Sequence, residues 1–219
     1  MGGWQMTRKT QKSIILKKAT EMTITTIIDN YIDGATGVHS NGISVYLGAT
    51  DILLARNRVY NSNIPLTFQN VHDLKIINNI FHGNGNNAAM ACWSGNSSNV
   101  IVKHNNLLAG NSWGGGFYNQ QGLINGLVIK NNIIDGMNAM SGDISHNIYT
   151  RSHSSLGVGE FVVGSLDSIF VDPLNHDYRL LLNSPAIDMG TESSVSEDID
   201  LKVRAVGAAP DIGAYEYGL

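Results

Sequence analysis

The chain has 219 residues, and its charged fraction of 15% lies well below the roughly 25% that is usual for soluble domains. Glycine is plentiful, with 24 residues, and proline is scarce, with 4. The net charge of −4 and the pI near 5.9 give the molecule no overall positive field. We therefore expect no nucleic-acid partner.

Three absences narrow the class of protein further. No segment reaches the roughly 18 consecutive apolar residues of a membrane span, so we expect none. The single cysteine, Cys92, excludes an internal disulfide. The N-terminus has no apolar run long enough for a signal peptide. Three explanations stay open: the protein is cytoplasmic, the signal has been removed, or the chain is the C-terminal part of something longer.

A repeat governs the first two thirds of the sequence. Each copy places apolar or β-branched residues five and three positions before a reference asparagine, and an apolar residue two positions after it. The copies are residues 25–32, 52–59, 74–81, 100–107 and 127–134, with the reference residues Asn30, Asn57, Asn79, Asn105 and Asn132. Subtraction gives spacings of 27, 22, 26 and 27. Asn147 follows after a shorter step of 15, which predicts a reduced final coil.

The alternation before each asparagine predicts a strand with every second side chain in a core. The parity changes across the asparagine, as it does at a sharp corner, and asparagine tolerates the left-handed backbone region. Equivalent asparagines stacked at the strand spacing of roughly 4.8 Å can also hydrogen-bond to one another. A helical interpretation fails because glycine and asparagine interrupt every stretch of sufficient length.

Each coil has a second strand upstream of this unit. These strands are expected at residues 14–16, 42–47, 64–69, 88–93 and 115–119. The strand at 42–47 fits best with Ile43, Val45 and Leu47 inside and with Ser44 and Tyr46 outside. The loops that enter these strands vary most in length, which places the variation on one face of the solenoid. We predict an all-β, single-stranded parallel β-helix of about five or six coils over residues 1–149.

The pattern stops near Tyr149. Residues 150–219 show no coil repeat, and a solenoid must cover its last hydrophobic cross-section. We therefore predict that they form an irregular C-terminal capping segment of the same domain.

These residues carry a family resemblance. From about Ser13 to Tyr149 the repeat resembles the pectin-lyase-like superfamily of right-handed parallel β-helices. The tail strings Asp-Tyr-Arg-Leu (177–180), Ser-Pro-Ala-Ile-Asp (184–188) and Asp-Ile-Gly-Ala-Tyr-Glu-Tyr (211–217) are similar to the C-terminal segment of bacterial secreted β-helix proteins of the choice-of-anchor Q or polysaccharide lyase-like kind. The resemblance implies a right-handed helix, a secreted or cell-surface location in a bacterium, and a polysaccharide partner.

The resemblance also indicates where a site would lie, because the superfamily's substrate groove runs over the first strand of each coil. Mapped onto this chain, the substrate-binding candidates are Asn41, Gln69, His82, Trp93, Trp113 and Tyr118. His39 and Tyr46 would form the acid–base pair of a lyase, which removes a proton α to a uronate carboxylate and protonates the leaving oxygen. In that scheme Asn41 or Gln69 would neutralise the carboxylate.

Other functions stay open. The same residues fit a non-catalytic carbohydrate-binding or cell-surface structural fragment, in which His39 is a loop residue and Tyr46 a stacked aromatic. A glycoside hydrolase ranks third, because it needs a carboxyl pair roughly 5–10 Å apart and only Asp33 and Asp135, several coils apart, are available. Lys103 and Lys130 should stack and point to solvent, where they could bind an acidic polymer or simply be solvated.

No cofactor is expected. The seven histidines are scattered without paired ligand spacing, which disfavours zinc. The tail acids Asp188, Asp198, Asp200 and Asp211 could hold Ca²⁺, and capping turns explain them as well. An uncapped N-terminal coil would expose strand edges, so a homodimer through that end is a reasonable expectation.

Overall fold

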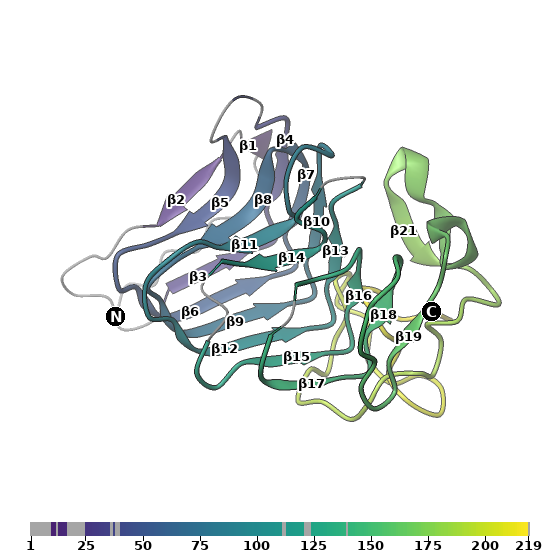
Figure 1. Ribbon diagram of the computed structural model, residues 1–219. Helices are drawn as coiled ribbons and strands as arrows, with labels where there is room; N and C mark the ends of the chain where they lie inside the picture. The colour runs from purple at the N-terminus through teal and green to yellow at the C-terminus, as the bar shows by residue number, and fades with distance from the viewer. Residues whose placement is uncertain are drawn as a thin grey trace.

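The computed structural model describes residues 10–11, 13–16, 25–35, 37, 40–110, 113–120, 124–138 and 140–218. Three parallel sheets, here sheets A, B and C, run side by side along one axis (Figure 1). Sheet B consists of β2 (Ile14–Leu16), β5 (Asn41–Val45), β8 (Ile64–Phe68), β11 (Met90–Cys92) and β14 (Phe117–Asn119). Sheet C consists of β3 (Thr25–Ile28), β6 (Thr50–Ala55), β9 (His72–Ile77), β12 (Ser98–Lys103), β15 (Val128–Lys130) and β17 (Asp143–Ser145).

Sheet A completes each coil, and a small antiparallel sheet lies in the tail. Sheet A consists of β1 (Thr10–Gln11), β4 (Tyr31–Asp33), β7 (Arg58–Ser62), β10 (Ile80–Gly83), β13 (Asn106–Leu108), β16 (Ile133–Ile134), β18 (Ile148–Tyr149) and β19 (Phe161–Val162). The tail contains the 3₁₀ turns η1 (Leu166–Ser168) and η2 (Pro173–Asn175) and the paired strands β20 (Phe170–Asp172) and β21 (Asp177–Leu180).

The chain visits sheets B, C and A in that order and so forms a parallel β-helix, which confirms the predicted fold class. The helix has about four turns, slightly fewer than predicted. The last coil is reduced because β17 and β18 follow no full strand in sheet B; only an isolated bridge, between Phe117 and Met137, marks that position. The short spacing before Asn147 therefore reflects a reduced final coil, as predicted.

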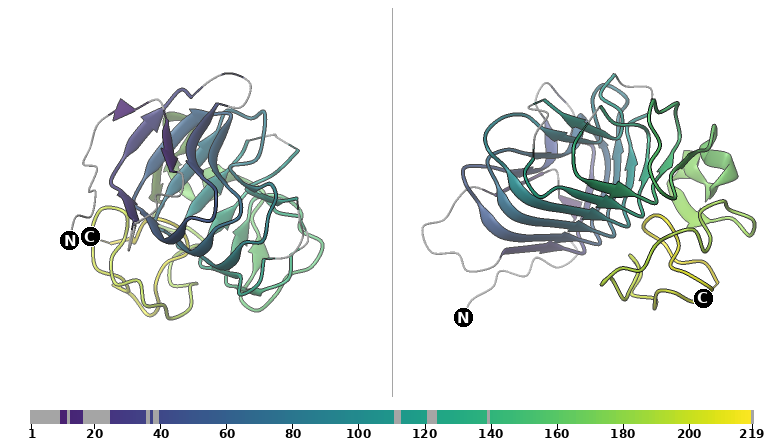
Figure 2. Two further views of the ribbon diagram at one scale, coloured as in Figure 1. Left: turned by 90° about the vertical axis from the view of Figure 1, so that its left-hand side faces the viewer. Right: turned by 60° about the horizontal axis from the view of Figure 1, so that its bottom comes forward.

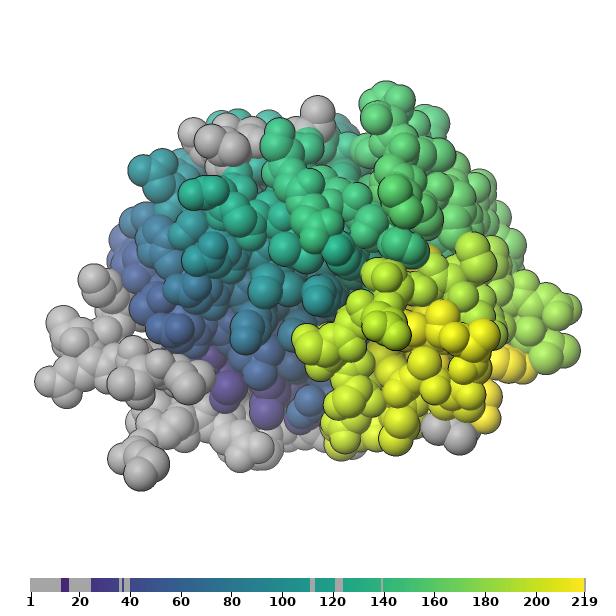
Figure 3. Space-filling view, turned by 90° about the horizontal axis from the view of Figure 1, so that it is seen from below, coloured from purple at the N-terminus to yellow at the C-terminus, as the bar shows by residue number. Residues whose placement is uncertain are grey.

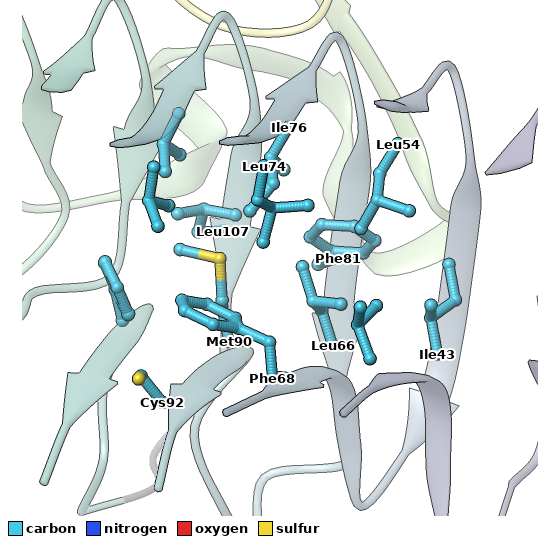
Figure 4. Packing of buried hydrophobic residues seen from close by; sticks show 14 of the residues in the cluster. Ile43, Leu54, Leu66, Phe68, Leu74, Ile76, Phe81, Met90, Cys92 and Leu107 are labelled. Atoms are coloured by element: carbon cyan, nitrogen blue, oxygen red, sulfur yellow. The ribbon is translucent and has the colours of Figure 1, made fainter. Parts of the chain in front are cut away.

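Strand register follows the repeat. Thr25 pairs with Ile52, Ile52 with Leu74, and Leu74 with Val100, as the superposed copies require. Side chains of one kind consequently stack from coil to coil inside the helix. One such stack comprises Ile27, Leu54, Ile76, Val102 and Ile129, all buried, and Figure 4 shows part of the packing around Leu54 and Ile76. Burying each such side chain contributes about 1.5–3 kcal/mol.

The corner between sheets C and A differs in one respect from the prediction. The residue in the left-handed region is the one before each reference asparagine, not the asparagine itself. These residues are Asp29 (φ 57°), Arg56 (φ 53°), Asn78 (φ 54°), His104 (φ 54°), Asn131 (φ 59°) and His146 (φ 53°). The reference asparagine itself keeps φ outside the left-handed region, and its side chain points into the core.

There the reference asparagines form the predicted ladder. The amide Nδ2 of each donates to Oδ1 of the next coil's asparagine at 2.9–3.0 Å, from Asn30 through to Asn147. Glu160 ends the ladder, because its Oε1 accepts from Asn147 Nδ2 at 2.8 Å and from Tyr149 Oη at 2.9 Å. At the other end, Asn30 Oδ1 is buried and accepts no hydrogen bond from any described residue.

Most of the tail lies along the side of the helix rather than beyond its last coil (Figure 2). Outward side chains of sheet A, among them Ile80, Ile133 and Ile148, pack with Tyr178 and Ile212 in a second hydrophobic cluster. Only residues 150–163 continue past the final coil, where β19 pairs with β18. The tail thus covers sheet A, and one of its loops, residues 194–197, also borders the outer face of sheet C.

Candidate functional site

Two rows of outward side chains cross sheet B along the helix axis. In the first row Ser44, Thr67, Ala91 and Tyr118 are cross-strand partners in successive coils. This row arises because successive residues of a strand point to opposite faces, and its neighbours Val45, Phe68 and Cys92 point inward.

The second row begins one residue beyond the ends of the strands. Main-chain hydrogen bonds continue the ladder there, from Gln69 N to Val45 O (3.1 Å), Trp93 N to Phe68 O (3.3 Å) and Gln120 N to Cys92 O (2.9 Å). Tyr46, Gln69, Trp93 and Gln120 therefore occupy equivalent positions in successive coils. We refer to these two rows together with Asn41, Ser94 and Trp113 as the sheet B surface.

An aromatic cluster dominates one end of the sheet B surface. The ring of Tyr118 lies 5.7 Å from that of Trp93 and 4.9 Å from that of Trp113, centroid to centroid, and the second pair is nearly edge-to-face. Ile64 and Ala91 pack beneath Trp93 and Tyr118. Such aromatic pairs add about 0.5–1.5 kcal/mol each beyond burial. The cluster holds Trp113 in place although 65% of its surface is exposed.

Polar groups occupy the rest of this surface. Asn41 Nδ2 lies 3.4 Å from both Ser44 Oγ and Tyr46 Oη. Asn41 Oδ1 is buried and has no hydrogen-bond partner among the described residues, and the same is true of Thr67 Oγ1. Such groups retain unused hydrogen-bonding capacity, which is costly unless a further group satisfies it.

The amide of Gln69 is partly engaged, because its Oε1 accepts from Ser94 Oγ at 3.0 Å. Sequence reasoning did not select Ser94. Gln120 belongs to the same face as the predicted residues, since it holds the same place after its strand as Tyr46, Gln69 and Trp93 hold after theirs.

The structure therefore brings five predicted residues to one face of sheet B and places a sixth, Asn41, at the edge of that face. These residues are Tyr46, Gln69, Trp93, Trp113 and Tyr118. His39 lies outside the described residues. Leu47, predicted to point inward, is 56% exposed, because its φ of 64° ends the strand alternation at that residue.

His82 is the predicted residue that the structure places elsewhere. It belongs to β10 of sheet A, beneath the tail, where its Nδ1 lies 2.7 Å from Tyr178 Oη and its ring meets His176 edge-on. Burial, and secondarily the neighbouring His176, lowers the pKa of His82 to about 4. The assignment of His82 to the substrate groove was wrong, because a residue three positions after the reference asparagine lies on the third strand of its coil.

Acidic residues do not contribute to this surface. Asp33 lies in β4 of sheet A and accepts from Asn61 Nδ2 at 2.8 Å, whereas buried Asp135 accepts from Ala109 N at 2.7 Å and from the hydroxyl of Thr150. Within the described ranges, the outer face of sheet B carries no charged side chain. Its chemistry there consists of hydroxyls, amides and aromatic rings.

The tail acids serve the tail's own turns. Asp198 Oδ1 accepts from the main-chain nitrogens of Asp200 and Lys202, at 2.7 and 2.9 Å, and Asp188 Oδ1 accepts from Ala209 N at 3.1 Å. Burial raises the pKa of Asp211 to about 6. In the part of the chain that the structure describes, no three His, Cys, Asp or Glu side chains gather closely enough to hold a metal ion.

No helix of the described ranges is long and apolar enough to cross a membrane.

In comparisons with known proteins, no family model matches this chain and no curated protein matches it. The geometry of the sheet B surface is therefore what a functional proposal must rest on.

Proposed function

We propose that this β-helix binds a polysaccharide along the sheet B surface, with the polymer parallel to the helix axis and crossing the strands. The observation that carries the proposal is the row of Tyr46, Gln69, Trp93 and Gln120, one residue per coil, beside the exposed ring of Trp113. Coils repeat at about 4.8 Å, a spacing comparable to the length of one sugar unit. A linear polymer of sugars can therefore meet equivalent groups in successive coils.

The residue types suit this partner. Sugar rings present apolar C–H faces, which pack on aromatic rings, and hydroxyl edges, which pair with amides such as Gln69 and Gln120. Asn41 Oδ1, to which no described residue donates, offers a further acceptor. Because the described part of this surface is uncharged, stacking and neutral hydrogen bonds would carry the affinity, and added salt should change it little.

The experiment is retention of the protein by neutral and acidic polysaccharides in affinity electrophoresis. We expect Trp113→Ala to weaken retention at least about tenfold, which corresponds to about 1.4 kcal/mol. The matched control is Tyr31→Ala, which removes an exposed aromatic ring from β4 of sheet A. No retention on any polymer, or equal losses in the two variants, would overturn the proposal.

Cleavage of an acidic polysaccharide by β-elimination is the second candidate. Its support is Tyr46, whose hydroxyl lies in the second row within 3.4 Å of Asn41 Nδ2. In this scheme His39 removes the proton α to the uronate carboxylate, Tyr46 protonates the leaving glycosidic oxygen, and a carbon–carbon double bond forms in the product.

The ultraviolet absorbance of that unsaturated product tests the lyase proposal. We expect absorbance to rise on incubation with pectate or alginate, and to be lost in Tyr46→Phe and in His39→Ala. Retention without any rise in absorbance leaves binding as the function, and reducing ends without absorbance would instead support hydrolysis. A secreted or cell-surface location in a bacterium goes with either proposal, since polysaccharides of this kind lie outside the cell.

We also propose that a second copy of the chain is a partner at the N-terminal coil. Two observations support this: β2 and β3 are the terminal described strands of sheets B and C, and Asn30 Oδ1 is buried without a described donor. Sedimentation velocity should then show a dimer whose mass falls to that of the monomer on dilution. A monomer at every concentration would refute it.

A further inference from the structure

A groove lies between the outer face of sheet C and a loop of the tail, well away from sheet B. Its volume is about 500 Å³. Figure 3 views the molecule from the side of sheet C and shows the tail lying against that face. Its floor includes Leu53, Lys75, Ile77, Ile101 and Lys103, and residues 194–197 form the opposite wall.

Apolar and cationic side chains alternate on the floor of this groove. Across β6, β9 and β12, Lys75 is the cross-strand partner of both Leu53 and Ile101. Two residues further along the strands, Ile77 pairs with Lys103 on β12. From the strand spacing and the rise per residue, the two lysine Cα atoms lie about 8 Å apart. The floor therefore offers two ammonium groups set among aliphatic side chains.

These two ammonium groups are available to a ligand. Neither Lys75 nor Lys103 forms an ion pair with another described residue, whereas nearby Arg56 is held by both oxygens of Asp29 at 2.8 Å. The next lysine in the stack, Lys130, is also occupied, because its Nζ lies 2.6 Å from Asp143. Among the described residues of this face, Lys75 and Lys103 are thus the two cations without an ion-pair partner, and both lie in the groove.

The wall opposite the lysines is held in place. Asn78 Nδ2 donates to Glu197 O at 2.7 Å, and the main-chain nitrogen of buried Arg204 donates to Ser196 O at 2.9 Å. Arg204 Nε also donates to Glu197 O at 3.3 Å. A ligand would therefore meet a preformed wall of Ser194, Val195, Ser196 and Glu197, and the charge of Glu197 is already engaged with Arg56. Little binding energy would be lost in ordering this wall.

We propose that this groove binds an acidic sugar, with a carboxylate of a uronate unit between Lys75 and Lys103 and the C–H face of its ring on Leu53 and Ile101. A uronate carries its carboxylate directly on a rigid ring, so charge and apolar surface arrive together in the arrangement that the floor presents. An acidic peptide presents its carboxylates on flexible side chains, whose immobilisation costs rotamer entropy. This site is separate from the sheet B surface. In this proposal, acidic ligands are recognised on sheet C.

Calorimetric titration of the full chain with a short oligogalacturonate tests the proposal, with the fully methyl-esterified oligomer as matched ligand. We expect the ester to bind at least tenfold more weakly, and added salt to weaken the acid but not the ester. The double variant Lys75→Gln, Lys103→Gln should lose at least tenfold in affinity for the acid. Lys130→Gln is the matched control, since it removes the same charge one coil along, outside the groove, and should change nothing.

Three results would overturn the assignment. The first is absence of oligogalacturonate binding, or equal binding of acid and ester, in the unmodified chain. The second is an equal loss in Lys130→Gln and in the double variant, which would show a diffuse charge effect. The third is tighter binding of a glutamate-rich peptide at the same lysines. Trp113→Ala separates the two proposals: it should weaken retention of polymer on sheet B and leave oligogalacturonate affinity for the groove unchanged.

Discussion

Replacing Asn105 by alanine removes one rung from the middle of the asparagine ladder. The side chain is fully buried, and its Nδ2 donates to Ile76 O and Lys103 O at 2.9 Å each and to Asn132 Oδ1 at 3.0 Å. Its Oδ1 accepts from the main-chain nitrogen of Asn79 at 2.8 Å and from the amide of the same residue at 3.0 Å. The substitution therefore affects three coils at once.

The cost follows from the groups left behind. Asn132 Oδ1 keeps its bond from the main-chain nitrogen of residue 105, and the Asn79 amide keeps two carbonyl acceptors. The main-chain nitrogen of Asn79 and the carbonyl of Ile76 lose the side-chain partner, whereas Lys103 O keeps the hydrogen bond that it accepts from Asn78 N at 3.2 Å. At about 1–2 kcal/mol for each of the two buried groups that lose this partner, we expect Asn105→Ala to lower the free energy of unfolding by about 3 kcal/mol.

Urea unfolding followed by far-ultraviolet circular dichroism measures this loss, as a lower midpoint with an unchanged slope. The matched control is Asn175→Ala, because Asn175 is an exposed asparagine outside the left-handed backbone region, and its amide donates to Asp172 at 2.7 Å. That variant should stay within about 0.5 kcal/mol of the parent. Equal losses in the two variants would refute the reasoning that buried rungs stabilise the helix.

Three further predictions concern the side chains of Arg204, His82 and Cys92. Arg204→Met should cost about 3–5 kcal/mol in unfolding experiments, because it leaves Glu216 buried without the partner that lies 3.1 Å away; a loss below about 1 kcal/mol would contradict this. In the folded protein the pKa of His82 is about 4, below its ordinary value of 6.5. Between these two pH values the unfolded chain therefore binds more protons than the folded chain. The free energy of unfolding consequently decreases as the pH falls from about 6.5 toward 4. His82→Gln should reduce that loss by about 3 kcal/mol, and an unchanged pH profile would count against it. Burial raises the pKa of the Cys92 thiol to about 11, so a maleimide at mildly alkaline pH should label it only after denaturation; rapid labelling of the native protein would show that the thiol is accessible.

The coil architecture was predictable because the repeat records the stacking of the core. Residues at the same position in successive coils face one another, so each must be apolar or a ladder asparagine, and spacing alone gave the pairing of Ile52 with Leu74 and of Leu74 with Val100. The left-handed corner position was misassigned by one residue. Its occupants, which include arginine and histidine, share no side-chain type that would mark it.

The course of the tail could not be read from its sequence, because an aperiodic segment has no register with the helix. A signal for its docking face was nevertheless present. Ile80, Ile133 and Ile148 directly follow reference asparagines and are buried on the outer side of sheet A. A third strand that is apolar on both faces indicates that something covers its outer side.

The two candidate sites also differ in how far they could be predicted from the sequence. The row of Tyr46, Gln69 and Trp93 was partly predicted, since alternation within each first strand determines which side chains point outward. The groove was not, because its lysines come from β9 and β12 whereas its wall comes from residues 194–197. Only the docked tail brings these segments together.

A crystal structure of the chain with a bound neutral oligosaccharide would show whether a sugar polymer lies on sheet B. We expect sugar rings in line along the helix axis, one packed on Trp113 and the next ones hydrogen-bonded to Gln69 and Gln120. Sugar density confined to another face, with the sheet B surface empty at saturating ligand, would refute polysaccharide binding at sheet B.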